Sequence, residues 1–156
     1  MSNKSLQGAC MCGAIQFKLK GLPKKSAICH CLDCQKSAGS AFQTSSVYAA
    51  SDVDIIDPEG HLKKYVVPGN KVGSGHEKHK YFCDVCGCPV YNMPMKEEGK
   101  IMVIKTGLID AEEGKGGLHA YKELKPQAEL FTRSRANYLS ALNNVDQFDT
   151  GFTPTK

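Results

Sequence analysis

The sequence predicts a mainly β fold with short helices. Short segments in which apolar and polar residues alternate recur about every ten residues, and glycine or proline turns separate them. Few segments have a helical period, and the chain contains no internal repeat. With 156 residues, the chain is long enough to bury a core of its own, and we expect a single domain over residues 1–156.

The first half of the chain contains the clearest strand pattern. In residues 14–20, Ile15, Phe17 and Leu19 alternate with polar side chains, which predicts a half-buried strand. Residues 32–38 are expected to form a short helical turn that ends at Gly39. The same reasoning predicts further strands at 26–29, 42–49, 53–56 and 62–67.

The second half is also predicted to be rich in strands. A glycine-rich loop is expected at 69–77 and a polar surface loop at 111–117. Residues 135–142 are predicted to form a helix near the C-terminus, with Ser134 as its N-cap. Apolar patterning predicts strands at 78–82, 89–93 and 101–105.

Composition limits the classes of function. No apolar run approaches the roughly 20 residues that a membrane span needs. Residues 1–7 are polar and lack the apolar core of a secretory signal, so we expect the cysteines to lie in a reducing compartment, the cytoplasm. The net charge is +4 but the lysines are scattered, so nucleic acid is not an expected partner.

Eight cysteines form three tight clusters, and this grouping indicates metal binding. Thiols two or three residues apart converge on one metal ion more easily than they form disulfides with each other. One tetrahedral zinc ion uses four thiolates, so the chain carries more ligands than one site needs. The clusters are Cys10 and Cys12; Cys29, Cys31 and Cys34; and Cys83, Cys86 and Cys88.

The first and third clusters together predict a closed site. Cys10 and Cys12, with Cys83 and Cys86, would surround one zinc ion with four thiolates and leave no position for a substrate. Such a site would clamp the N-terminal segment to a late hairpin. The alternative, buried reduced cysteines, does not explain the CxC and CxxC spacing.

The middle cluster predicts a site of a different kind. Cys29, Cys31 and Cys34 supply three thiolates and leave a fourth position for water or an incoming thiol. The alternative is a second closed site, completed by Cys88, His30 or another histidine. Cys88 can share a metal with Cys86 or be a small packed residue.

Four further residues have two interpretations each. His30 lies between two ligands, so its side chain is expected to point away from their metal. His79 can reach a pocket or lie in solvent. Arg133 and Arg135 can clamp a carboxylate or form an exposed pair before the late helix, and the exposed pair is the favoured interpretation.

Three motifs resemble one known family. The segments Gly8 to Gly13, Cys29 to Phe42 and Tyr81 to Gly87 are similar in order and spacing to the glutathione-dependent formaldehyde-activating enzyme (GFA) family, which includes centromere protein V. The resemblance spans about residues 6–130 and leaves a C-terminal extension at 131–156. It implies a zinc-binding β-tent fold with two Zn²⁺ ions. The structural zinc maps to Cys10, Cys12, Cys83 and Cys86, and the catalytic zinc maps to Cys29, Cys31 and Cys34.

The resemblance also implies an activity. The family adds the glutathione thiol to formaldehyde, so the resemblance implies a carbon–sulfur lyase with a small-molecule thiol substrate, glutathione or a related thiol. The alternative is a non-catalytic zinc-binding chaperone or adaptor module of the same fold, motivated by the possibility that Cys88 closes the second site. A methionine sulfoxide reductase would need a nucleophilic cysteine late in the chain, and no cysteine follows Cys88.

Overall fold

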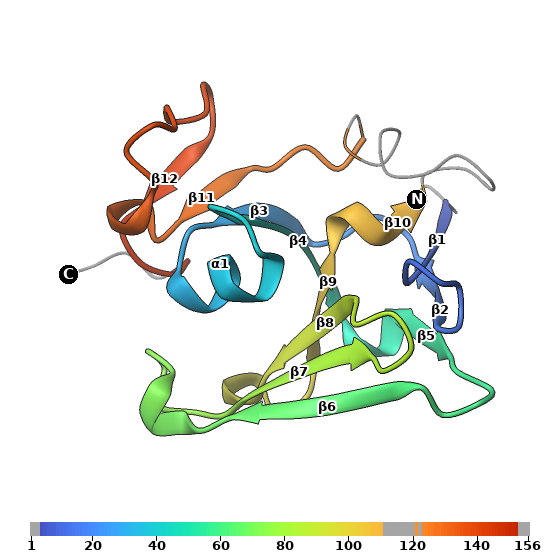
Figure 1. Ribbon diagram of the computed structural model, residues 1–156. Helices are drawn as coiled ribbons and strands as arrows, with labels where there is room; N and C mark the ends of the chain where they lie inside the picture. Colours follow the sequence, from blue (N-terminus) through green and yellow to red (C-terminus); the bar gives the residue numbers. More distant parts are fainter. Residues whose placement is uncertain (1–3, 111–120, 122, 153–156) are drawn as a thin grey trace.

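The computed structural model describes residues 4–110, 121 and 123–152, and these form twelve strands in two sheets (Figure 1). The prediction of a mainly β fold with short helices is confirmed. The smaller sheet is antiparallel and has the order β10-β1-β2-β5. Its strands are β10 (Ile109–Asp110), β1 (Ser5–Ala9), β2 (Gln16–Lys20) and β5 (Val53–Ile56).

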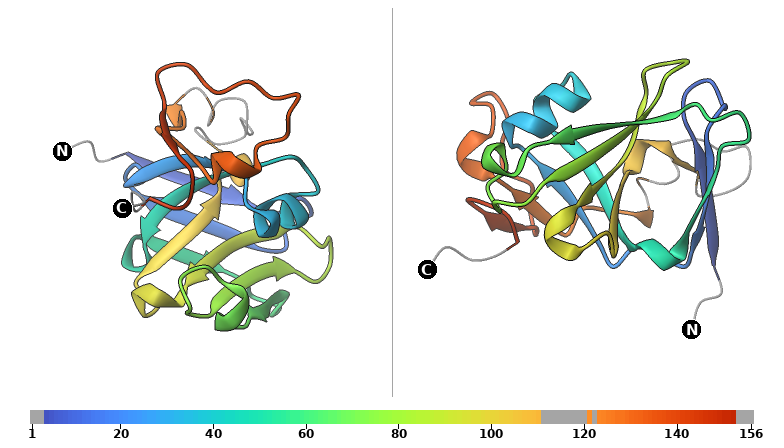
Figure 2. Two further views of the ribbon diagram at one scale, coloured as in Figure 1. Left: turned by 90° about the vertical axis from the view of Figure 1, so that its left-hand side faces the viewer. Right: turned by 90° about the horizontal axis from the view of Figure 1, so that it is seen from below.

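The larger sheet has the order β12-β11-β3-β4-β9-β8-β7-β6. Strand β11 pairs in parallel with both neighbours, and the other pairs are antiparallel. Figures 1 and 2 show the smaller sheet at one side of the molecule and β11 and β12 at the other. The strands are β12 (Asp146–Phe148), β11 (Ala128–Leu130), β3 (Lys25–Cys29), β4 (Gln43–Ala49), β9 (Ile101–Lys105), β8 (Pro89–Pro94), β7 (Lys78–Cys83) and β6 (Leu62–Val67).

Two apolar clusters hold the sheets together. The main core contains side chains from both sheets, such as Phe17 and Leu19 of β2 and Ile104 of β9, all at most 1% exposed. The alternation that predicts β2 is therefore the pattern that buries one of its faces. A smaller cluster packs β3 against β11 and consists of Ala27, Cys29, Ala128 and Leu130.

Helical structure is sparse. Helix α1 (Leu32–Ala38) ends at Gly39, whose φ of 59° is left-handed, as the sequence predicts. No helix among the residues described here is long and apolar enough to cross a membrane. The remaining helical turns are 3₁₀: η1 (Ala50–Asp52), η2 (Gly69–Lys71), η3 (Met95–Glu97), η4 (Thr106–Leu108) and η5 (Thr132–Ser134).

The prediction of a helix at 135–142 is wrong. The chain there is irregular after η5, and Tyr138 stays 76% exposed. A helix would have no apolar face to bury, and the Leu142 amide instead donates to the buried carboxylate of Glu129. The other expected strands are all present within one or two residues, whereas β1, β10, β11 and β12 were not expected. The loop expected at 111–117 lies outside the described residues.

Candidate metal centres

The four-cysteine cluster joins two turns that are distant in sequence. Cys10 and Cys12 lie in the turn between β1 and β2, while Cys83 ends β7 and Cys86 lies in the turn before β8. The Cys12 Sγ lies 3.6 Å from Cys10 Sγ and 3.7 Å from Cys83 Sγ. All four sulfurs lie within 4.8 Å of one another. The structure therefore brings the predicted closed set together.

Both turns use a left-handed glycine to aim their thiols. Gly13 has a φ of 79° and donates to Cys10 O, and Gly87 has a φ of 71° and donates to Cys83 O. An added side chain would strain either backbone.

Although burial alone raises the pKa of Cys86, backbone amides of Cys88 and Cys12 donate to its sulfur and lower that pKa to about 6. The turn thus favours a thiolate.

The sulfur spacing fits a tetrahedral metal ion. Zinc–sulfur bonds of about 2.3 Å place tetrahedral sulfurs about 3.8 Å apart. The distances from Cys12 to its two neighbours are within 0.2 Å of that value at 3.6 and 3.7 Å. The four thiols can therefore hold such an ion with little rearrangement.

The three-cysteine cluster comes from one short segment. Cys29 ends β3, Cys31 is the N-cap of α1, and Cys34 lies in the first turn of that helix. Their sulfurs also lie within 4.8 Å of one another, and no histidine, aspartate or glutamate of the described chain joins them. The strand-to-helix turn thus presents three ligands.

Electrostatics favour a charged sulfur in this cluster. The thiols of Cys29 and Cys34 donate to the Cys31 sulfur, which lowers the pKa of Cys31 to about 2. The same interactions raise the pKa of Cys29. These shifts favour a thiolate at Cys31, and a cation bound among the three sulfurs would favour loss of the remaining thiol protons.

Three lysines surround the three-cysteine cluster. Lys78 Nζ lies 3.0 Å from Asp33 Oδ2, and Lys80 Nζ donates to Asp33 O at 3.2 Å, so both reach from β7 to α1. Lys105 is 5% exposed and donates to Gln43 Oε1 at 2.7 Å. Burial lowers the pKa of Lys105 to about 8. The nearby charges of Cys34 and Cys29 act in the opposite direction and raise this pKa, but burial has the larger effect. The lysines offset the negative charge of the thiolates.

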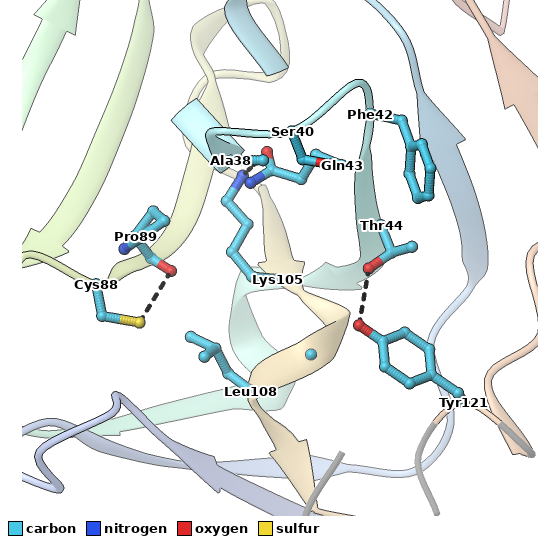
Figure 3. A pocket seen from close by; sticks show the side chains of 11 residues that line it. Ala38, Ser40, Phe42, Gln43, Thr44, Cys88, Pro89, Lys105, Leu108 and Tyr121 are labelled. Atoms are coloured by element: carbon cyan, nitrogen blue, oxygen red, sulfur yellow. Dashed lines mark hydrogen bonds between the residues drawn. The ribbon is translucent and has the colours of Figure 1, made fainter. Parts of the chain in front are cut away.

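A pocket of about 540 Å³ adjoins Lys105. Figure 3 shows Lys105 reaching toward Gln43 on one wall, with Thr44 hydrogen-bonded to Tyr121 on another. Its volume lies in the range typical of small-molecule sites. The walls combine apolar and polar side chains: Ala38, Ser40, Phe42, Gln43, Thr44, Cys88, Pro89, Lys105, Gly107, Leu108 and Tyr121.

Cys88 and the histidines that the structure describes do not complete the second cluster. The Cys88 sulfur belongs to neither cysteine group; it faces the pocket and lies 3.8 Å from Pro89 O. His30 Nε2 lies 3.2 Å from Glu129 Oε1, away from the cluster, as its position predicts. His79 pairs with Glu77 at 3.0 Å and does not line the pocket.

The interpretation of the arginines as an exposed pair is wrong for Arg135. Arg133 is exposed, but the Arg135 side chain is 19% exposed and donates to Glu129 Oε2 at 2.8 Å. The carboxylate that it clamps is thus one of the chain's own. The partner, Glu129, is 2% exposed on β11.

A comparison with known protein families identifies the family to which the chain belongs. The model of the glutathione-dependent formaldehyde-activating enzyme family matches residues 5–134. The chain belongs to this family. The match contains both cysteine clusters and ends with η5, so Arg135 and the residues after it lie beyond the match. The division into a core and a C-terminal extension stays a prediction.

A solved structure supports the fold independently. A crystal structure of a Rhodobacter sphaeroides protein is 18% identical and covers 69% of this GFA chain and 88% of its own, with a TM-score of 0.51. This likeness concerns the fold alone. No curated protein matches the chain significantly.

Two site residues had no clear signal in the sequence. Lys105 ends an apolar strand, where a lysine usually reaches solvent, and Glu129 lies in a segment with no strand pattern. Both are buried because of partners far away in sequence, at Gln43 and His30. Only the fold reveals these pairs.

Proposed function

We propose that this GFA-family chain is a zinc-dependent carbon–sulfur lyase that adds glutathione or a related thiol to formaldehyde or another small carbonyl. One observation supports this more than any other: the cluster of Cys29, Cys31 and Cys34 has three ligands and, among the described residues, no fourth. The pocket of about 540 Å³ is lined by Lys105, whose charge interacts with Cys34 and Cys29, and it has room for a small molecule. Family membership supplies the reaction class.

The two clusters would hold two Zn²⁺ ions with different roles. Cys10, Cys12, Cys83 and Cys86 would hold a structural ion, because their four thiolates complete a tetrahedron. Cys29, Cys31 and Cys34 would hold a catalytic ion. When bound there, zinc supplies a vacant position at which a substrate thiol is kept as a thiolate near neutral pH.

The protein's own side chains would orient and neutralise the reactants. The substrate loses its S–H proton, a sulfur–carbon bond forms at the carbonyl carbon, and the carbonyl oxygen gains a proton, so no electrons leave or enter. Lys105 lies in the pocket wall with its charge close to Cys34. Its ammonium group would stabilise the negative charge that develops on the carbonyl oxygen.

The non-catalytic alternative loses its main support. The candidates to close the second site are Cys88, His30 and the other histidines, and none of those that the structure describes joins the three-cysteine group. The free cysteines suit a reducing compartment, and we propose the cytoplasm.

Exchange spectroscopy of glutathione mixed with formaldehyde tests the function. The zinc-loaded protein is expected to speed exchange between the free thiol and its hydroxymethyl adduct, and the metal-free protein is not. An exchange rate equal to that without protein would exclude this substrate pair. The same assay with another small thiol then tests the wider reaction class.

A further inference from the structure

A buried polar network lies behind the three-cysteine cluster. His30 is 1% exposed, and its Nε2 lies 3.2 Å from Glu129 Oε1. The other carboxylate oxygen of Glu129 accepts from Arg135 at 2.8 Å and from the Leu142 amide at 3.2 Å. One carboxylate therefore connects the metal-binding turn to the segment after β11.

A second connection runs beside the first. Gln35 Nε2 donates to His30 O at 2.7 Å and to Ser134 O at 3.1 Å. The His30 amide also donates to Leu130 O at 3.0 Å. The backbone of His30 is thus held at its carbonyl by Gln35 of α1 and at its amide by Leu130 of β11.

The burial of Glu129 requires these partners. A buried carboxylate is costly unless hydrogen bonds compensate it. Burial raises the pKa of Glu129, but hydrogen bonds from Gln147 and His30 outweigh it and keep the pKa below its usual value. The 3.2 Å contact between His30 Nε2 and Glu129 Oε1 anchors the ring at one nitrogen. The network thereby fixes the orientation of the ring.

We propose that Glu129 is a positioning residue for the three-cysteine metal site and acts through His30. Cys29 and Cys31 flank His30 directly, so the orientation of its ring and backbone sets the direction of both thiols. Residues 135–147 hold Glu129 in place, although they lie beyond the matched family region. The proposal rests on the proposed function, since it requires a zinc ion at this cluster.

Zinc release from the full, doubly loaded chain tests the proposal. Glu129→Gln should speed transfer of one zinc to a chromophoric chelator by about 10-fold, the lower end of the range for groups that bind a metal ligand directly, because Glu129 acts through His30. The zinc of the four-cysteine site should leave at its original rate. After cobalt substitution, only the absorption bands of the three-cysteine site should shift.

Arg135→Met provides a second variant that leaves the His30–Glu129 contact in place. It should speed release of the same zinc by a smaller factor. Arg133→Met and Glu97→Gln are matched controls, since both residues are exposed, and neither should alter release.

Two results would overturn the positioning role alone. One is unchanged release in both variants, and the other is equal acceleration at both sites, which indicates a general loss of stability. An unmodified chain that holds a single zinc after full loading would overturn the proposed function, and the positioning role with it.

Discussion

The two cysteine clusters differ in reach and in surroundings. The four-cysteine cluster joins residues as far apart as Cys12 and Cys83, and two of its members, Cys10 and Cys83, are buried in the main core. The three-cysteine cluster comes from one turn between β3 and α1, near lysines, of which Lys105 also lines the pocket. The first cluster connects distant segments, whereas the second is local.

This difference teaches how one ligand type serves two purposes. A metal ion that closes a long loop removes much conformational freedom from the unfolded chain, so it stabilises the fold. An ion held by ligands from Cys29 to Cys34 closes only a short loop and contributes little in this way. We therefore expect the four-cysteine site to govern stability and the three-cysteine site to govern reactivity.

The largest expected effect is on stability, from Cys83→Ser. Cys83 is 0% exposed, and its loss breaks the closed site. The free energy of unfolding should fall by about 4 kcal/mol or more, since loss of a metal site is one of the few single changes of that size. Denaturant unfolding measures this. Cys88→Ser is the matched control and should keep both metal ions; equal stability of the two variants would contradict the assignment.

Cys31→Ser should reverse that pattern. One zinc should be lost and thiol addition should fall to the rate without protein, while the free energy of unfolding changes by only about 1 kcal/mol. Metal counting, the exchange assay and unfolding on one preparation separate these effects. A loss of stability as large as that of Cys83→Ser would remove the distinction between the sites.

Lys105→Met should lower activity while both zinc ions stay bound. Removing a charge that stabilises the carbonyl oxygen costs about 100-fold in rate. Exchange kinetics and metal counting test this, with the exposed Lys100→Met as control. Full activity in Lys105→Met would show that the carbonyl binds elsewhere.

The smallest effect concerns Asp84, between two ligands of the closed site. Hydrogen bonds from His61 and Lys63 hold the pKa of Asp84 below its ordinary value of 3.8, so its contribution is present above that pH and is lost as pH falls through the lowered pKa. Asp84→Asn should therefore lower Tm slightly at neutral pH and leave it unchanged at an acidic pH below the lowered pKa. Calorimetry at both pH values checks this, and a difference that persists in acid would contradict the pairing.

The sequence predicts the regular part of the molecule well. Strands such as β2 and β9 have apolar alternation or apolar runs, and α1 has a glycine stop, so local patterns suffice. The ligand clusters are also visible, because metal binding demands short spacing. Both follow from interactions close along the chain.

The C-terminal region escapes prediction for a physical reason. Strand β11 (Ala128–Leu130) is fully buried although its centre is a glutamate, and charged residues are rarely buried. Its burial depends on His30, 99 residues earlier, and on Arg135. No local pattern encodes such a contact, so the sequence suggested a helix at 135–142 where the chain instead surrounds Glu129.

The zinc-edge X-ray absorption spectrum of the doubly loaded chain tests the central claim most directly. One closed and one open site predict an average of about 3.5 sulfur and 0.5 oxygen or nitrogen ligands per zinc. Added glutathione should raise the sulfur fraction as its thiol takes the open position. A spectrum with sulfur ligands alone before glutathione is added would contradict the account, because both sites would then be closed.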